Sequence, residues 1–229
     1  MEAALTPQSK PTLNTPNFGL LMQYKNEDVI HKFREEWKVS EDEAKDIFDE
    51  TKKFLFLASV TTQKCFNLDI NEPLLIIDKM WHTFILFTED YADFCNTHFG
   101  TMLHHQPFSK NHLKKLIKKL SEHGMTLSEA KSKHLYQQLG FIEETLGRQT
   151  IVKWYVEYSE KYSPGKLSSL QKPLFDGEAR LTEHNNIEQA SHSASSDLIK
   201  MIVSAYTTSQ YCGTNCGAYC SCNSGSLHM

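Results

Sequence analysis

Apolar side chains recur every three or four positions through most of residues 26–162, which is the spacing of one buried face of an α-helix. The strict alternation that marks a half-buried strand does not occur before residue 165. Residues suited to N-capping, such as Asn26, Ser40, Asn71 and Thr88, precede several of the periodic segments. The pattern predicts an all-α fold, a compact bundle of six to seven helices. We place these helices at residues 26–37, 41–60, 71–86, 88–99, 109–123, 128–146 and 150–162.

The two ends of the chain differ in composition from this helical region. Residues 1–18 combine three prolines with polar residues and are predicted to form a disordered arm, so the helical domain is placed at residues 19–163. Residues 164–206 are mostly polar and are predicted to form a flexible linker with a short apolar docking segment. Residues 207–229 are rich in cysteine and glycine and form the predicted C-terminal tail.

The composition of the 229-residue chain narrows the class of protein. Its hydrophobic fraction of 40% is enough to fill a core, which argues against wholesale disorder. Its net charge of −4 argues against a nucleic-acid binder, whose surface would be basic. The apolar runs are too short to cross a bilayer and no secretion signal is visible, so we expect a cytoplasmic protein without a membrane span.

Positive charge is concentrated in one part of the chain. Residues 109–134 carry seven basic and two acidic side chains, a net charge of +5, whereas residues 1–108 carry a net charge of −7. Five of these lysines lie on the predicted helix 109–123, around an apolar stripe. We interpret the helix as a solvated face that balances the acidic region; contact with anionic lipid, RNA or an acidic partner is the alternative.

The most unusual chemistry lies on the most apolar predicted helix and just after it. Asp78 and His82 are four positions apart and therefore share one helix face. A buried carboxylate or imidazole is costly unless it is paired or binds a metal, so we expect both to be largely buried and partnered. One interpretation is a structural Asp–His pair. The other is a zinc or iron site in which His82 and Cys95 are ligands, His104 or His105 comes from the following loop, and Asp78 is a ligand or orients one.

The residues around this candidate site resemble a known family. The run Asp78-x2-Trp81-His82-x8-Tyr91-x3-Cys95-x4-Gly100 is similar to the signature of the glycine-rich domain-containing protein-like family, in its bacterial form. The resemblance extends over residues 20–162. It implies a helical domain of unknown biochemical activity, often followed by a glycine- or cysteine-rich tail.

The predicted tail is the second candidate site. Cys212, Cys216, Cys220 and Cys222 are spaced C-x3-C-x3-C-x-C. A flexible cluster of thiolates binds soft metals without regular spacing, so zinc or copper(I) is one expected ligand. Alternatively, the tail is a substrate for covalent modification, or an exposed end with no role. The expected partner is then a protein or a modifying enzyme that acts on the tail.

Nucleotide chemistry has no support, because neither a phosphate-binding loop nor a dinucleotide fingerprint is present. The sequence therefore favours a non-catalytic metal-binding or interaction protein whose helical domain presents a thiol-rich tail. Two alternatives stay open. One is a ribosomal peptide precursor with a post-translationally modified tail, and the other is a metal-dependent enzyme with a site built on His82 and Cys95.

Overall fold

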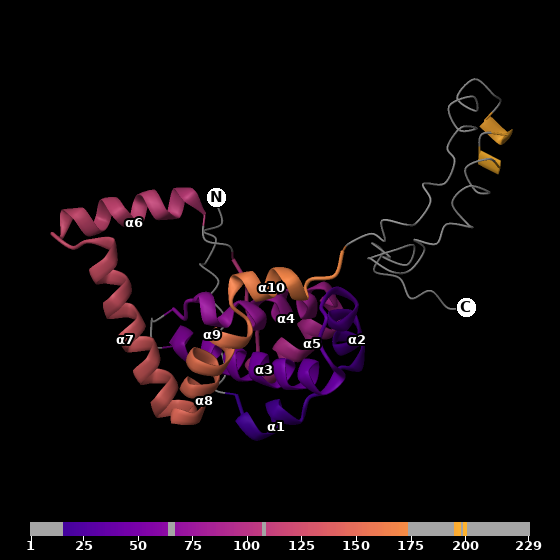
Figure 1. Ribbon diagram of the computed structural model, residues 1–229, viewed down its shortest axis with the longest axis horizontal. Helices are drawn as coiled ribbons and strands as arrows, with labels where there is room; N and C mark the ends of the chain where they lie inside the picture. The colour runs from indigo at the N-terminus through magenta and orange to yellow at the C-terminus, as the bar shows by residue number, and fades with distance from the viewer. Residues whose placement is uncertain (1–15, 64–66, 107–108, 174–194, 198, 201–229) are drawn as a thin grey trace, which may run out of the picture. The chain divides into compact units, whose positions relative to one another are not determined.

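The chain divides into two units, residues 1–171 and 172–229. The structure, a computed structural model, describes residues 16–63, 67–106, 109–173, 195–197 and 199–200 (Figure 1). All the helices named below belong to the first unit. Among the described residues the fold is all-α, as the sequence predicted, and the β-pairing is limited to an isolated bridge between Trp37 and Gln171.

The first unit is built from ten α-helices, one 3₁₀ helix (η1) and one π-helix (η2) within the residues described. Their bounds are α1 (Phe18–Gln23), α2 (Glu27–Glu36), α3 (Glu41–Gln63), η1 (Glu72–Leu74), α4 (Leu75–Leu86), α5 (Thr88–Phe99), α6 (Lys110–Glu122), α7 (Leu127–Leu146), α8 (Arg148–Val152), η2 (Lys153–Glu157), α9 (Tyr158–Lys161) and α10 (Pro164–Leu170). Because η1 leads into α4 and α8, η2 and α9 are consecutive, the described residues between 26 and 162 form seven helical segments, the number predicted.

Local side-chain chemistry explains where several helices begin and end. The Asn26 side chain accepts a hydrogen bond from the Val29 backbone N–H at 3.0 Å, and Ser109 accepts one from His112 at 3.2 Å. α7 begins one residue earlier than predicted because Thr126 and Glu129 form a reciprocal capping box. α5 ends at Gly100, whose φ of 75° lies in the left-handed region that glycine adopts without strain.

The core lies where α3, α4 and α5 meet. α4 was predicted to be central because it is apolar nearly all round, and Ile76, Ile77, Met80 and Phe84 are indeed fully buried in it. The Phe84 ring has edge-to-face contacts with rings of α3 and α5, at centroid distances of 5.1–5.3 Å to Phe48, Tyr91 and Phe94. These contacts fix α5 and the chain that follows it against α4.

A second row of contacts joins α3 to the continuous helix formed by α8, η2 and α9. Three hydroxyl or indole donors of this helix meet three carboxylates of α3 in antiparallel order. The pairs are Trp154 with Glu50 at 2.8 Å, Tyr158 with Asp46 at 3.1 Å, and Tyr162 with Glu43 at 2.6 Å. Eight residues of α3 (Glu43–Glu50) thus face nine of its partner (Trp154–Tyr162), and the π-turn of η2, which holds more residues per turn, fits this difference.

The helical unit continues beyond residue 163, the C-terminal bound predicted from the sequence. Pro164 occupies the first turn of α10 and therefore starts a helix instead of closing one. Leu167 of α10 is buried, and the Lys38 backbone N–H donates to the Leu170 carbonyl at 2.7 Å. Most of the predicted linker, the whole tail at residues 207–229 and residues 1–15 of the predicted arm lie outside the described residues. The prediction of a disordered arm is wrong for its last residues, because Asn17 caps α1 and Phe18 begins it.

The helices α6 and α7 stand somewhat apart from the others. In Figure 1, α6 is set away from the α2–α5 bundle and is joined to it through the long helix α7. No residue of α6 is buried, whereas the second half of α7 contributes the buried Gln138 and Ile142. The predicted amphipathic helix 109–123 therefore exists, but its apolar face is not part of the core.

Candidate metal centre

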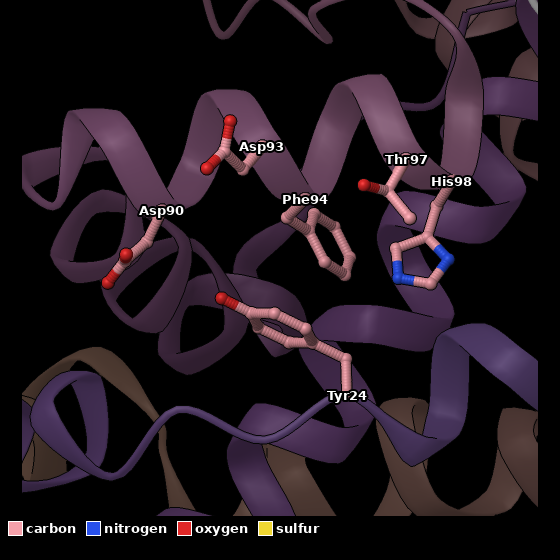
Figure 2. A pocket seen from close by; sticks show the side chains of 6 residues that line it. All are labelled: Tyr24, Asp90, Asp93, Phe94, Thr97 and His98. Carbon is pink, nitrogen blue, oxygen red and sulfur yellow. The ribbon is translucent and has the colours of Figure 1, made fainter.

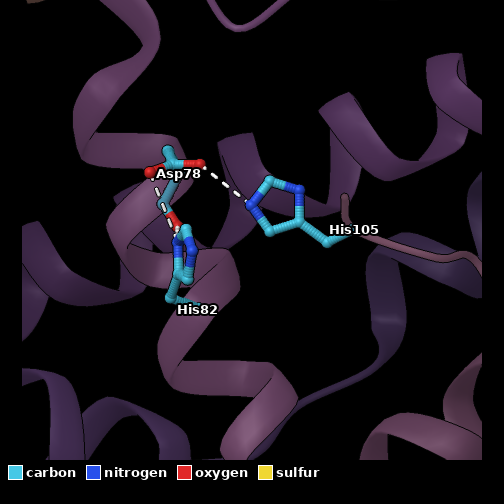
Figure 3. Close-up of side chains that lie close together, drawn as sticks. All are labelled: Asp78, His82 and His105. Carbon is cyan, nitrogen blue, oxygen red and sulfur yellow. Dashed lines mark hydrogen bonds and ion pairs between the residues drawn. The ribbon is translucent and has the colours of Figure 1, made fainter. Parts of the chain in front are cut away.

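The centre of the candidate site is the carboxylate of Asp78 on α4. One helical turn later on the same face, the His82 Nδ1 lies 2.7 Å from the Asp78 backbone oxygen and 3.3 Å from its Oδ2. The other carboxylate oxygen, Oδ1, lies 3.2 Å from His105 Nε2. Figure 3 shows the two imidazoles approaching different oxygens of this carboxylate. The spacing of four residues on α4 accounts for the first contact, while the second depends on the path of the chain after α5.

A buried relay of side chains holds the segment that carries His105. The Trp81 Nε1–H donates to the Tyr91 hydroxyl at 3.0 Å, and this hydroxyl donates to the Leu103 carbonyl at 2.7 Å. The His105 ring also lies against the Trp81 indole, with ring centroids 4.2 Å apart. Trp81 and Tyr91 are both buried, so the relay links α4 and α5 to the backbone two residues before the ligand candidate.

Burial and charge act in opposite directions on Asp78. Burial alone would raise the pKa of this carboxyl, but the hydrogen bond with His105 and the nearby charges of His82 and Lys79 outweigh it and lower that pKa below the ordinary aspartate value. The carboxylate is therefore ionised at neutral pH. An ionised, nearly buried carboxylate between two imidazoles is a donor set suited to a divalent cation.

The three residues differ in their exposure to solvent. The side chains of Asp78 and His105 are 12% and 16% exposed, but that of His82 is 53% exposed. The prediction that His82 is largely buried is therefore wrong, because it lies on the edge of α4 that reaches solvent, where Leu86 is also exposed. The prediction that it contacts Asp78 is confirmed.

The structure does not bring the other predicted ligands of the helical domain to this cluster. Cys95 is fully buried, and its thiol lies beside the Tyr91 hydroxyl and the Leu103 backbone. Burial raises the pKa of the Cys95 thiol, so it is a neutral group that packs under the 101–106 segment and not a thiolate ligand. His104 is exposed and lies outside the cluster. The predicted ligands Cys212, Cys216, Cys220 and Cys222 lie outside the described residues.

Each of Asp78, His82 and His105 offers one donor atom, and the three atoms lie within 4.8 Å of one another. No other group of three such ligands was found among the described residues. The sequence could identify Asp78 and His82 from their spacing, but it held no signal to separate His105 from His104. Only the relay through Trp81 and Tyr91 makes that choice.

A shallow cleft lies elsewhere, between α5 and the chain after α1. It has a volume of about 230 Å³ and is lined by Tyr24, Asp90, Asp93, Phe94, Thr97 and His98 (Figure 2). Burial, reinforced by the charge of Lys52, lowers the pKa of His98. The Tyr24 and Phe94 rings lie only 4.8 Å apart and occupy much of the space between the two elements. We therefore assign no ligand to this cleft.

Comparison with known proteins places the helical unit in a family. A family model described as UCP032817-like matches residues 20–139, more than half of the chain, and this stretch contains Asp78, His82 and His105. The match overturns the assignment to the glycine-rich domain-containing protein-like family that the Trp-His, Tyr and Cys motif suggested; in this fold, that motif forms the buried relay beneath the 101–106 segment. No curated protein and no solved structure matches the chain. The chain belongs to the UCP032817-like family, which is uncharacterised.

Proposed function

We propose that this protein binds a metal ion, and that its helical domain holds one zinc ion between Asp78, His82 and His105. The observation that supports the proposal is the convergence of one carboxylate and two imidazoles within 4.8 Å. Ligand atoms around a tetrahedral zinc ion are about 3.4 Å apart. The carboxylate–imidazole distances of 3.2 Å and 3.3 Å are close to this value, and a bound metal would replace the 2.7 Å contact of His82 Nδ1 with the Asp78 backbone oxygen.

The donor set favours a particular group of metals. Two imidazoles and one carboxylate bind zinc, and the same set also binds ferrous iron. Zinc is the stronger competitor for such a site, because divalent zinc binds nitrogen and oxygen ligands more tightly than divalent iron does. With three protein donors, a water molecule would fill the fourth position on the side where His82 faces solvent.

A metal-dependent enzyme is the second candidate. The observation that favours it is the same count of three donors, because catalytic zinc sites keep one position open for water or substrate. The site would then be built on Asp78, His82 and His105, since Cys95 lies outside the cluster. Azide should bind a cobalt-loaded open site and change its visible spectrum, whereas a closed site should not respond.

Zinc titration by calorimetry tests the proposal on the full-length chain with the four tail cysteines changed to serine, which removes competing thiolates. We expect one zinc ion per chain, and loss of binding by at least about tenfold in both the His82→Ala and the His105→Ala variants. His104→Ala is the matched control, because His104 is adjacent in sequence and exposed but lies outside the cluster.

The outcomes separate a metal site from a purely structural cluster. If the protein binds no zinc, or if the His104→Ala variant loses binding as much as the His105→Ala variant does, the proposed site is wrong. Thermal unfolding with and without zinc provides a second measurement, since a ligand that binds only the folded state raises the unfolding temperature. Elemental analysis of protein purified without an affinity tag then identifies the metal that it acquires in cells.

A further inference from the structure

The helix α6 is the largest feature of the described structure that the proposed metal site does not use. It begins at a capped Ser109, runs from Lys110 to Glu122, and is followed by Gly124 with a φ of 65°. Its chief neighbour among the described helices is α7, and Figure 1 shows it apart from the α2–α5 bundle. Local residues therefore define both ends of α6, and the core does not cover its surface.

One side of α6 is an apolar stripe that remains accessible. Leu113, Leu116, Ile117 and Leu120 follow the spacing i, i+3, i+4, i+7, so they lie along one face. Leu116 is 37% and Ile117 46% exposed, and no residue of the helix is buried. Aliphatic side chains arranged in this way normally cover a core, and here they do not.

The rest of the helix surface is strongly basic. Its five lysines are all exposed, and none forms an ion pair with another of the described residues: Lys110, Lys114, Lys115, Lys118 and Lys119. The one acidic residue of the helix, Glu122, is at its C-terminal end. At 100° per residue, Lys110 and Lys114 border one edge of the apolar stripe and Lys119 borders the other. The lysines therefore flank the stripe on both sides.

Two kinds of surface could cover the apolar stripe of α6, and the contact area that each one needs distinguishes them. A second copy of the chain would need an interface of about 800 Å² per partner, contributed by some 20–30 residues. α6 offers only four apolar side chains on a 13-residue helix. An anionic lipid surface needs less, because aliphatic side chains enter the headgroup boundary while lysines attract the lipid phosphates and carboxylates.

We propose that α6 is a docking helix that lies in the surface of an anionic lipid bilayer. The Leu113, Leu116, Ile117 and Leu120 side chains enter the boundary between headgroups and acyl chains, and the flanking lysines contact the negative headgroups. The helix does not cross the bilayer: no described helix is long and apolar enough to do so. Membrane docking of this kind is independent of whether the Asp78 site binds a metal.

Flotation of the full-length protein with lipid vesicles tests the proposal. We expect binding to phosphatidylcholine vesicles that contain about 30% phosphatidylserine, and little binding to phosphatidylcholine alone. Because each lysine near an anionic surface contributes about a fivefold increase in partitioning, changing Lys114→Gln and Lys118→Gln together should lower the partition coefficient about thirtyfold. Leu116→Gln with Ile117→Gln should lower it by more than about tenfold.

A matched control separates the docking helix from general charge attraction. Lys25 and Lys166 are exposed lysines outside α6, so Lys25→Gln with Lys166→Gln removes the same charge and should leave partitioning within about twofold of the unchanged protein. Circular dichroism establishes that each variant keeps its helices. The changes in α6 lie on an exposed surface and should not affect folding.

Four outcomes would overturn the proposal. The first is no binding to the anionic vesicles, and the second is an equal loss in the control and the α6 variants. The third is a dimer in solution, seen by light scattering, that the Leu116→Gln and Ile117→Gln changes convert to a monomer while vesicle binding is absent. In that case a second copy of the chain covers the stripe. Binding of RNA by the same lysines, without vesicle binding, would also contradict it.

Discussion

The contact between Trp154 and Glu50 offers a direct test of how the continuous helix formed by α8, η2 and α9 is held to α3. The Trp154 indole is fully buried, and its N–H donates to Glu50 Oε2 at 2.8 Å. The other oxygen of this carboxylate, Oε1, contacts Lys53 at 2.8 Å and Lys153 at 3.0 Å. Glu50 is only 1% exposed, so water cannot replace a partner that is removed. Trp154→Phe removes the indole donor and leaves an aromatic ring in place.

The expected cost follows from these contacts. A hydrogen bond to a charged group contributes about 1.5–3 kcal/mol. Replacing indole by the smaller phenyl ring in a fully buried position adds a cavity cost of about 1 kcal/mol. The two lysines still compensate the Glu50 charge, so the loss stops well short of that for an unpaired buried ion. We expect Trp154→Phe to lower the free energy of unfolding by about 2.5–4 kcal/mol.

Tyr158→Phe is the matched comparison, one helical turn away. The Tyr158 hydroxyl donates to Asp46 at 3.1 Å, but the Asp46 side chain is 47% exposed and can be hydrated after the donor is lost. Its removal should therefore cost about 0.5–1 kcal/mol. Urea unfolding followed by far-ultraviolet circular dichroism measures the free energy of unfolding of both variants. The two free energies are comparable when they fall with urea concentration at the same slope. A Trp154→Phe cost no larger than that of Tyr158→Phe would refute the reasoning from burial.

Two further predictions follow from other polar contacts. Gln138 is fully buried; it forms hydrogen bonds with the backbone N–H and carbonyl of Asp69, at 2.8 Å and 2.9 Å, and with the Tyr155 hydroxyl. Gln138→Leu should therefore lower the free energy of unfolding in urea by about 2–3 kcal/mol. The same change at the exposed Gln137 should change that free energy little. Burial would raise the pKa of Glu43, but hydrogen bonds from Tyr162 and Lys161 lower it below the unfolded value. Because this pKa is depressed in the folded state, its contribution to stability is present above about pH 4.3, the ordinary glutamate value, and is lost as the pH falls toward the folded pKa. Stability measured between neutral pH and about pH 3 should therefore fall less steeply in a Glu43→Gln variant, and identical pH profiles would contradict this assignment.

Much of the fold could be predicted because its signals are local. Asn26 and Ser40 cap helices through atoms three residues away, as predicted, and apolar periodicity marks the face that each helix buries. The predicted caps Asn71 and Thr88 form no such bond, because Asn71 begins a 3₁₀ turn and Thr88 lies inside α5. The same rules misplaced the C-terminal end of the helical unit, because Pro164 is compatible with both the end of one helix and the first turn of the next. Likewise, the sequence located the amphipathic helix α6 but could not show that its apolar face lies outside the core.

The candidate site depends only in part on local sequence patterns. The spacing of Asp78 and His82 determined that they share one face of α4, since four residues make about one helical turn. The third member, His105, lies 27 positions after Asp78 and adjoins an equally plausible His104; the buried bonds through Trp81 and Tyr91 decide which imidazole faces the carboxylate. Those same contacts place Cys95 in the core as a neutral thiol, away from the site where its residue type had suggested a ligand. Periodicity and capping act over one turn of a helix, whereas the direction of a side chain at the end of a loop depends on contacts between segments that only the folded chain brings together.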